Sequence, residues 1–230
     1  MQSANCKRVA IFGSTALAAL IAVATVQAGA DGGTLAMGSI GSRSLTLMMH
    51  DGWDSDLPVR DKETIRKTFD LGAGGKSLQL DNVNGNIEIT GSDSNQVELV
   101  VNKTIRAKTD AKLEDARREV TLDVKHNGGA LELYVDGPFR CRCGDRRSVN
   151  FQRHPGYSVR MDFELRVPRN VDLQVSTVNE GQVRIRDVKG SYDVSNVNGG
   201  IEMTSVAGSG SAHTVNGAVK VSFTENPRLE

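Results

Sequence analysis

Aromatic side chains are scarce in this sequence, and so are cysteine and net charge. Only 4% of the 230 residues are Phe, Trp or Tyr, and the chain holds 3 cysteines and 1 tryptophan. The 28 basic residues balance the 28 acidic ones, so charge does not favour nucleic acid or an acidic substrate as a partner. Glycine is frequent, with 24 residues, and this composition is typical of a repeat protein with many turns.

Catalytic signatures are also missing from the sequence. No Gly-x-Ser-x-Gly nucleophile motif occurs, and the four histidines lie in unrelated contexts. The Gly72–Gly75 run lacks the strand-loop-helix context that a phosphate-binding loop needs. Asp193 and Glu202 alternate with basic residues, as on a solvated surface, instead of forming the carboxylate cluster of a glycan-cleaving enzyme. We therefore predict a protein that is not an enzyme and that binds no cofactor or metal.

A short repeat dominates the stretch from Leu173 to Phe223. Each copy follows the pattern apolar, any, apolar, any, any, Val, any, Gly, with small departures in the first and last copies. The valine of each copy stands at position 178, 188, 197, 206 or 215, so the steps are 10, 9, 9 and 9 residues. A fixed period of this kind indicates stacked, equivalent strands.

Alternation within each copy predicts half-buried strands, because successive side chains of a strand point to opposite faces. We expect the following residues to face the core: Val183, Ile185, Val194, Ile201 and Met203. The repeat valine follows the second apolar position by three residues, so the alternation breaks there. A bulge or corner would turn this valine back toward the core, and the glycine after it would supply a turn.

Two all-β architectures fit this pattern. Asn-Gly between alternating runs is typical of hairpins and favours an antiparallel β-meander or a sandwich. Near-identical units favour a β-solenoid, a β-helix-like stack with two units, or roughly 18 residues, in each coil. In a solenoid, Asn179, Asn198 and Asn216 would stack as a ladder of side-chain amides, although turn formation alone would also explain them. The solenoid is the preferred prediction.

Composition divides the chain into three parts. Residues 1–30 have the pattern of a secretory signal peptide, with Lys7 and Arg8 before the apolar run Val9–Val26 and small residues at 28–30. An uncleaved membrane anchor is the alternative. Residues 31–61 are rich in Gly, Ser, Asp and Met without periodicity, which predicts a flexible linker. Residues 62–230 are the expected β-repeat domain of an exported protein located in the periplasm, the cell envelope or the medium.

Within this domain, residues 92–170 interrupt the repeats that resume over 171–227. Val97–Ile105 and Val159–Val167 alternate as strands, and residues 109–119 have the apolar spacing of a short helix. Asn127-Gly128-Gly129 indicates a hairpin between two further strands. We predict an inserted segment that packs on the sheet of regular repeats or extends it.

One motif recurs in three segments, Phe69–Ile87, Ser195–Gly199 and Thr214–Gly217. In this motif the chain resembles a bacterial family of uncharacterised β-strand-repeat domains that are often labelled adhesins, and the resemblance covers roughly residues 63–227. It implies a secreted or envelope-associated solenoid-like domain and carries no catalytic residues. Because "adhesin" is itself a label by analogy of fold, the resemblance does not identify a ligand.

One unusual loop, residues 137–156, contains the candidate site residues. They are Cys141, Cys143, Arg140, Arg142, Arg146, Arg147 and Arg153. The cysteines could form a disulfide, which would be strained and easily reduced because the ring is small. Together with His154 they could instead bind a metal, one ligand short of a closed zinc site. The arginines, with Phe139 and Phe151, could bind an anionic glycan, a phosphate or a lipid headgroup, and a solvated loop without a ligand is the remaining interpretation.

These observations predict an adhesin-like, non-enzymatic scaffold that is exported and presents a surface for envelope or extracellular interaction. The expected partner is an envelope protein or a polysaccharide. Nucleic acid is not expected, and a membrane is expected only through the signal segment if that segment stays uncleaved. The alternatives are a carbohydrate-acting β-solenoid enzyme and an envelope signalling accessory domain.

Overall fold

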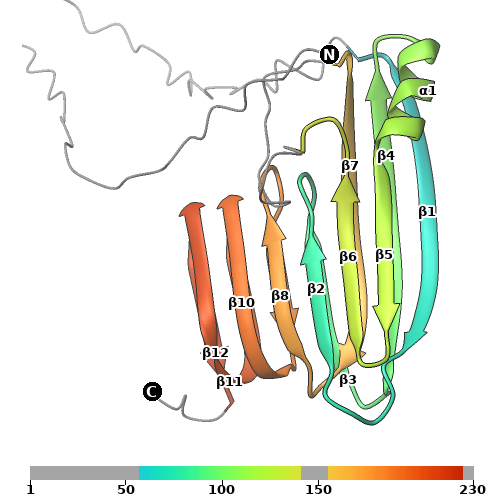
Figure 1. Cartoon of the computed structure of the whole chain (residues 1–230). Coiled ribbons are helices and arrows are strands. Elements are labelled where there is room, and N and C mark those ends of the chain that lie inside the picture. Colours follow the sequence, from blue (N-terminus) through green and yellow to red (C-terminus); the bar gives the residue numbers. More distant parts are fainter. Residues whose placement is uncertain (1–56, 141–154, 225–230) are drawn as a thin grey trace, which may run out of the picture. The chain divides into compact units, whose positions relative to one another are not determined.

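A computed structural model describes residues 57–140 and 155–224, which belong to one compact unit (Figure 1). The predicted signal peptide and most of the predicted linker lie outside these residues. In the described part of the chain, no helix is both long and apolar enough to cross a membrane.

Strands dominate the described residues. Their order is β1 (Val59–Asp70), β2 (Ser77–Asp81), β3 (Ile87–Ser92), β4 (Gln96–Ala107), α1 (Asp110–Glu119), β5 (Thr121–Asn127), β6 (Ala130–Asp136), β7 (Tyr157–Pro168), β8 (Asp172–Thr177), β9 (Val183–Arg186), β10 (Lys189–Asn198), β11 (Ile201–Asn216) and β12 (Val219–Phe223). The prediction of a mainly β protein with one short helix is confirmed. Thr109 caps the helix, since its hydroxyl oxygen accepts a hydrogen bond from the Lys112 N–H at 3.3 Å.

The strands join into one sheet in the order β1-β4-β7-β3-β9-β11-β10-β8-β2-β6-β5, with β12 beside β11. The long strand β11 is shared: Ile201–Thr204 pairs with β9, and the later part of β11 pairs with β10. We call the strands from β1 to the first part of β11, with β12, sheet A, and the strands from the later part of β11 to β5, sheet B. The two sheets form two layers (Figure 1), and their inner faces supply a single apolar core.

Neighbouring repeat strands are parallel. Ile201 pairs with Val183 and with Val219, which lie 18 residues before and after it. The Asn-Gly corners at 198–199 and 216–217 therefore carry the chain from sheet B to sheet A, whereas a meander would need antiparallel neighbours. The predicted amide ladder is present, because the Asn198 side chain donates to Asn179 at 2.9 Å and the Asn216 side chain donates to Asn198 at 2.8 Å.

The five side chains predicted to face the core are buried: Val183, Ile185, Val194, Ile201 and Met203. The repeat valines do not share one environment, however, and this corrects the prediction that each turns inward. Val188 and Val206 are buried, but Val197 is 36% exposed and Val215 is 56% exposed. The remaining repeat valine, Val178, is half-buried.

The backbone explains this difference between the valines. Asp187 and Ser205 have φ angles of 57° and 55°, and each directly precedes a buried valine. A residue in this left-handed region reverses the alternation, so the next side chain points inward. Asn196 has no positive φ, so the alternation of β10 continues, with Asn196 buried and Val197 outside.

The middle segment belongs to the same stack. β6 pairs in parallel with β2, and β7 pairs in parallel with β3, so these two strands add one more pair to the two sheets. β4 and then β1 extend sheet A with antiparallel pairing, and β5 does the same for sheet B. Helix α1 packs beside β1, β4 and β7, with Leu113 and Ala116 buried.

Candidate functional site

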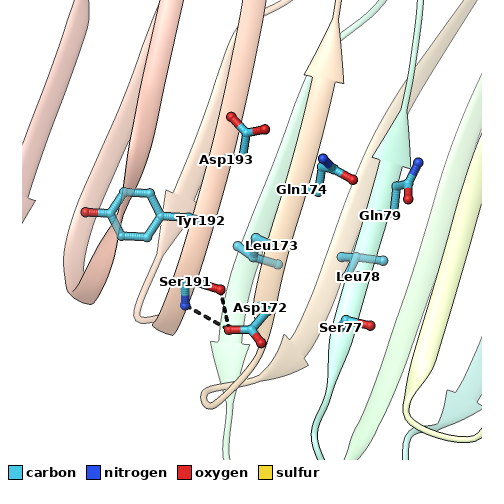
Figure 2. Close-up of a pocket in the computed structure, with 9 residues that line it drawn as sticks. All are labelled: Ser77, Leu78, Gln79, Asp172, Leu173, Gln174, Ser191, Tyr192 and Asp193. Atoms are coloured by element: carbon cyan, nitrogen blue, oxygen red, sulfur yellow. Dashed lines mark hydrogen bonds between the residues drawn. The ribbon is translucent and has the colours of Figure 1, made fainter. Parts of the chain in front are cut away.

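A shallow hollow of about 390 Å³ lies across β2, β8 and β10 of sheet B (Figure 2). Its lining consists of Ser77, Leu78, Gln79, Asp172, Leu173, Gln174, Ser191, Tyr192 and Asp193. Leu78, Leu173 and Tyr192 are buried in the core. The six polar residues alternate with these three along the strands, so their side chains project from the outer face of the sheet.

Parallel pairing in register arranges the polar side chains in rows across the strands. Gln79 pairs with Gln174, and Gln174 pairs with Asp193, so these three form one row. Ser77 pairs with Asp172, and Asp172 accepts a hydrogen bond from Ser191, so these three residues form a second row. Neighbouring strands lie about 4.8 Å apart, so each row offers hydrogen-bonding groups at a regular interval.

Hydrogen bonds fix the acidic groups of this surface. The Ser191 hydroxyl and N–H donate to Asp172 Oδ1 at 2.6 and 2.8 Å (Figure 2). These bonds, first that of the hydroxyl and then that of the N–H, hold the pKa of Asp172 below its ordinary value. The Ser211 hydroxyl similarly donates to Asp193 at 2.9 Å. A carboxylate with a lowered pKa is a poor general acid, so Asp172 serves better as a hydrogen-bond acceptor.

Arg140, one of the five arginines predicted to bind an anion, is buried at the start of the loop. Its Nη2 donates to Asp81 Oδ1 at 2.8 Å, and its Nε donates to the Val135 carbonyl at 2.9 Å. The guanidinium also lies 4.5 Å from the centre of the Tyr134 ring. The two paired side chains are only 2% and 5% exposed. Arg140 therefore anchors the start of the loop, residues 137–140, to sheet B, and its charge is already paired.

The other predicted site residues lie outside the residues that the structure describes. These are Cys141, Cys143, Arg142, Arg146, Arg147 and Arg153. The disulfide and anion-binding hypotheses for this loop stay predictions. Within residues 57–140 and 155–224, no three His, Cys, Asp or Glu side chains are grouped so that they could hold a metal ion.

Sequence reasoning missed the polar rows of sheet B. A signal was available, because the run Leu78-x-Leu80 matches Leu173-x-Val175 and pairs with it in register. Aligning these copies places Gln79 beside Gln174. Asp81, the partner of Arg140, had no such signal, since 59 residues separate the two.

Comparisons with known proteins found few similarities. No family model and no curated protein matches the sequence. A "putative cell adhesion protein" from Clostridium sporogenes matches with a TM-score of 0.35 and 10% identity, over 71% of this chain and 100% of that one. A "putative adhesin" from Parabacteroides merdae has a TM-score of 0.24 and 10% identity over 66% and 55% of the two chains. A third structure, a "putative adhesin" from Bacteroides fragilis, has a TM-score of 0.23 and 12% identity over 70% of this chain and 95% of that one. TM-scores this low carry no argument about function.

Proposed function

We propose that this chain is an exported, adhesin-like scaffold without catalytic activity, built as a β-solenoid, whose sheet B binds an extended envelope polysaccharide. The observation that carries the proposal is the row of Gln79, Gln174 and Asp193 on neighbouring strands. Amide and carboxylate groups suit the many hydroxyls of a sugar chain. Their regular spacing suits a polymer, since several weak contacts along one chain add up to a useful affinity.

Export is part of the same proposal and rests on the residues at the start of the sequence. Lys7 and Arg8 before an apolar run are typical of a segment that directs secretion. An exported binder would meet envelope polysaccharides directly. The lowered pKa of Asp172 makes this side chain unsuited to the acid role in glycan cleavage, which needs a carboxyl group that remains protonated.

Retention on immobilised envelope polysaccharides tests the proposal. The double variant Gln79→Ala/Gln174→Ala should weaken retention roughly thirtyfold, since it removes two side chains whose hydrogen bonds contribute about 1 kcal/mol each. The matched control is Thr90→Ala/Thr204→Ala, which removes two polar groups from the outer face of sheet A, where Thr90 and Thr204 both pair with Arg186. This control should bind as the parent chain does.

Three results would contradict the proposal. Release of shortened sugars by the parent chain would show an enzyme. Equal losses of retention in both double variants would show that the ligand does not bind sheet B specifically. If no envelope polysaccharide retains the parent chain, the ligand is not a polysaccharide of this class.

The loop arginines are proposed as a second contact for the same polymer. In this proposal, Arg142, Arg146, Arg147 and Arg153 pair with its anionic groups, and a Cys141–Cys143 disulfide holds the loop after export. Arg146→Gln/Arg147→Gln should then weaken binding to anionic envelope polymers at low salt and leave binding to neutral ones unchanged. Unchanged binding to the anionic polymers would show that the loop arginines do not contact the polymer.

A further inference from the structure

Exposed apolar side chains gather at one end of the strand stack. Among the described residues, Val215, Val219, Val221 and Phe223 are 56%, 41%, 37% and 38% exposed. All four belong to β12 or to the later part of β11. These two strands, residues 209–216 and 219–223, form what we call the open end.

The open end also presents unpaired strand edges. β12 pairs with β11 alone, and the later part of β11 pairs with β10 on one side. On their other sides, no strand of the described residues supplies partners for the backbone N–H and C=O groups. Such an edge beside apolar side chains is a template for pairing with another chain.

The opposite end of the stack is protected, which makes the contrast informative. There the edge strand of sheet A, β1, carries seven charged residues among its twelve: Arg60, Asp61, Lys62, Glu63, Arg66, Lys67 and Asp70. The edge strand of sheet B at this end, β5, carries Asp123 and Lys125 among its seven residues. Helix α1 also packs against β1, β4 and β7 at this end. Charged edge strands discourage pairing. By comparison, β12 carries one charged residue, Lys220.

The side chains of the open end are complementary to themselves. If β12 pairs antiparallel with a second β12 about Val221, Val219 lies opposite Phe223 and Lys220 lies opposite Ser222. Apolar groups then meet apolar groups, and the two lysines do not face each other. The edge of β11 also avoids facing charges, since pairing about Ala212 sets Ser211 opposite His213 and Ser209 opposite Val215.

We propose that the open end binds the open end of a second copy of this chain, so that sheets A and B each continue across a two-fold axis. Because both edge strands at the opposite end carry charges, the described part of each chain has one such surface, and a two-fold contact uses both. Association therefore stops at a dimer and does not extend into a filament. The dimer would present two ligand-binding sheets B.

Sedimentation of the full chain over a range of concentrations tests this proposal. The parent chain should form a reversible dimer. Val221→Lys should weaken the dimer at least tenfold, because two lysines would face each other at the two-fold axis. The matched control, Val197→Lys, adds the same charge at an exposed valine of β10, one strand in from the open end, and should leave the dimer intact.

Hydrogen exchange supplies a readout that needs no variant. The amides of β12 should exchange more slowly as the concentration of the parent chain rises, whereas those of β1 should not change. A monomer at all concentrations, particles larger than a dimer, or a Val221→Lys dimer as tight as the parent would each overturn the proposal. Protection of β12 at every concentration would also overturn it, because the chain's own residues would then cover the open end.

Discussion

Two residues with positive φ, Asp187 and Ser205, decide which repeat valines enter the core. The residue type alone does not reveal this, because a positive φ is uncommon in residues other than glycine. For this reason the sequence pattern identified the alternating core positions correctly but treated all the repeat valines as equivalent. The environments of Val188 and Val197 differ even though the two occupy the same place in the repeat.

This difference predicts unequal effects of truncating the two valines. Val188→Ala should lower the free energy of unfolding by about 2 kcal/mol, because it removes buried methyl groups and leaves a cavity. Val197→Ala should lower it by less than about 0.5 kcal/mol, as is usual for a surface position. Urea unfolding followed by circular dichroism measures both, and equal losses would contradict the assigned environments.

The buried pair of Arg140 and Asp81 gives a second prediction at this scale. Arg140→Ala should lower the free energy of unfolding by about 3–5 kcal/mol, because Asp81 would keep an unpaired charge in a buried place. Arg169, which pairs with the exposed Asp93, is the control, and Arg169→Ala should have no measurable effect. If Arg140→Ala unfolds at the same urea concentration as the control, Arg140 does not anchor the loop.

At the scale of elements, a column of glycines allows the strands to stack closely at one corner. A Cβ on Gly181 would lie 1.9 Å from the Gly85 carbonyl oxygen, and one on Gly199 would lie 1.9 Å from that of Gly181. Gly217 has the same relation to Gly199, at 2.2 Å. Only glycine permits the backbone to approach so closely.

The column predicts a steric effect that a surface glycine should not have. Gly181→Ala should lower the free energy of unfolding by about 1–3 kcal/mol or more, because the neighbouring backbone must move. Gly74→Ala is the control, since a Cβ there has no neighbour within 4 Å and the φ of Gly74 is not positive. Thermal unfolding compares the two, and a Gly181→Ala melting temperature equal to that of the control would argue against close stacking.

Elements differ in how far the sequence predicts them. The amide ladder of Asn179, Asn198 and Asn216 follows from the repeat period once the repeat strands are taken as parallel, because the period then sets the register. The positions of β6 and β7 do not follow, because Leu131 pairs with Leu78 across a long segment with no repeat. The rows of sheet B fall between these cases, since they need both the local pattern and the pairing of copies distant in the chain.

At the scale of the whole molecule, the account depends on parallel stacking in two sheets. Parallel register brings Gln79 beside Gln174 and thereby builds the proposed ligand surface. It also leaves strand edges unpaired at β12 and at the later part of β11, whereas antiparallel strands extend the sheets at the other end. Both proposals, polysaccharide binding and dimer formation, therefore follow from the same arrangement.

Nuclear Overhauser contacts between backbone protons of the deuterated chain test this arrangement most directly. Parallel stacking predicts that Val194 has interstrand contacts with Val175 and with Ala212, its two partners in sheet B. Contacts that instead join β10 to the start of β11 across the Asn198-Gly199 corner, in antiparallel register, would contradict it.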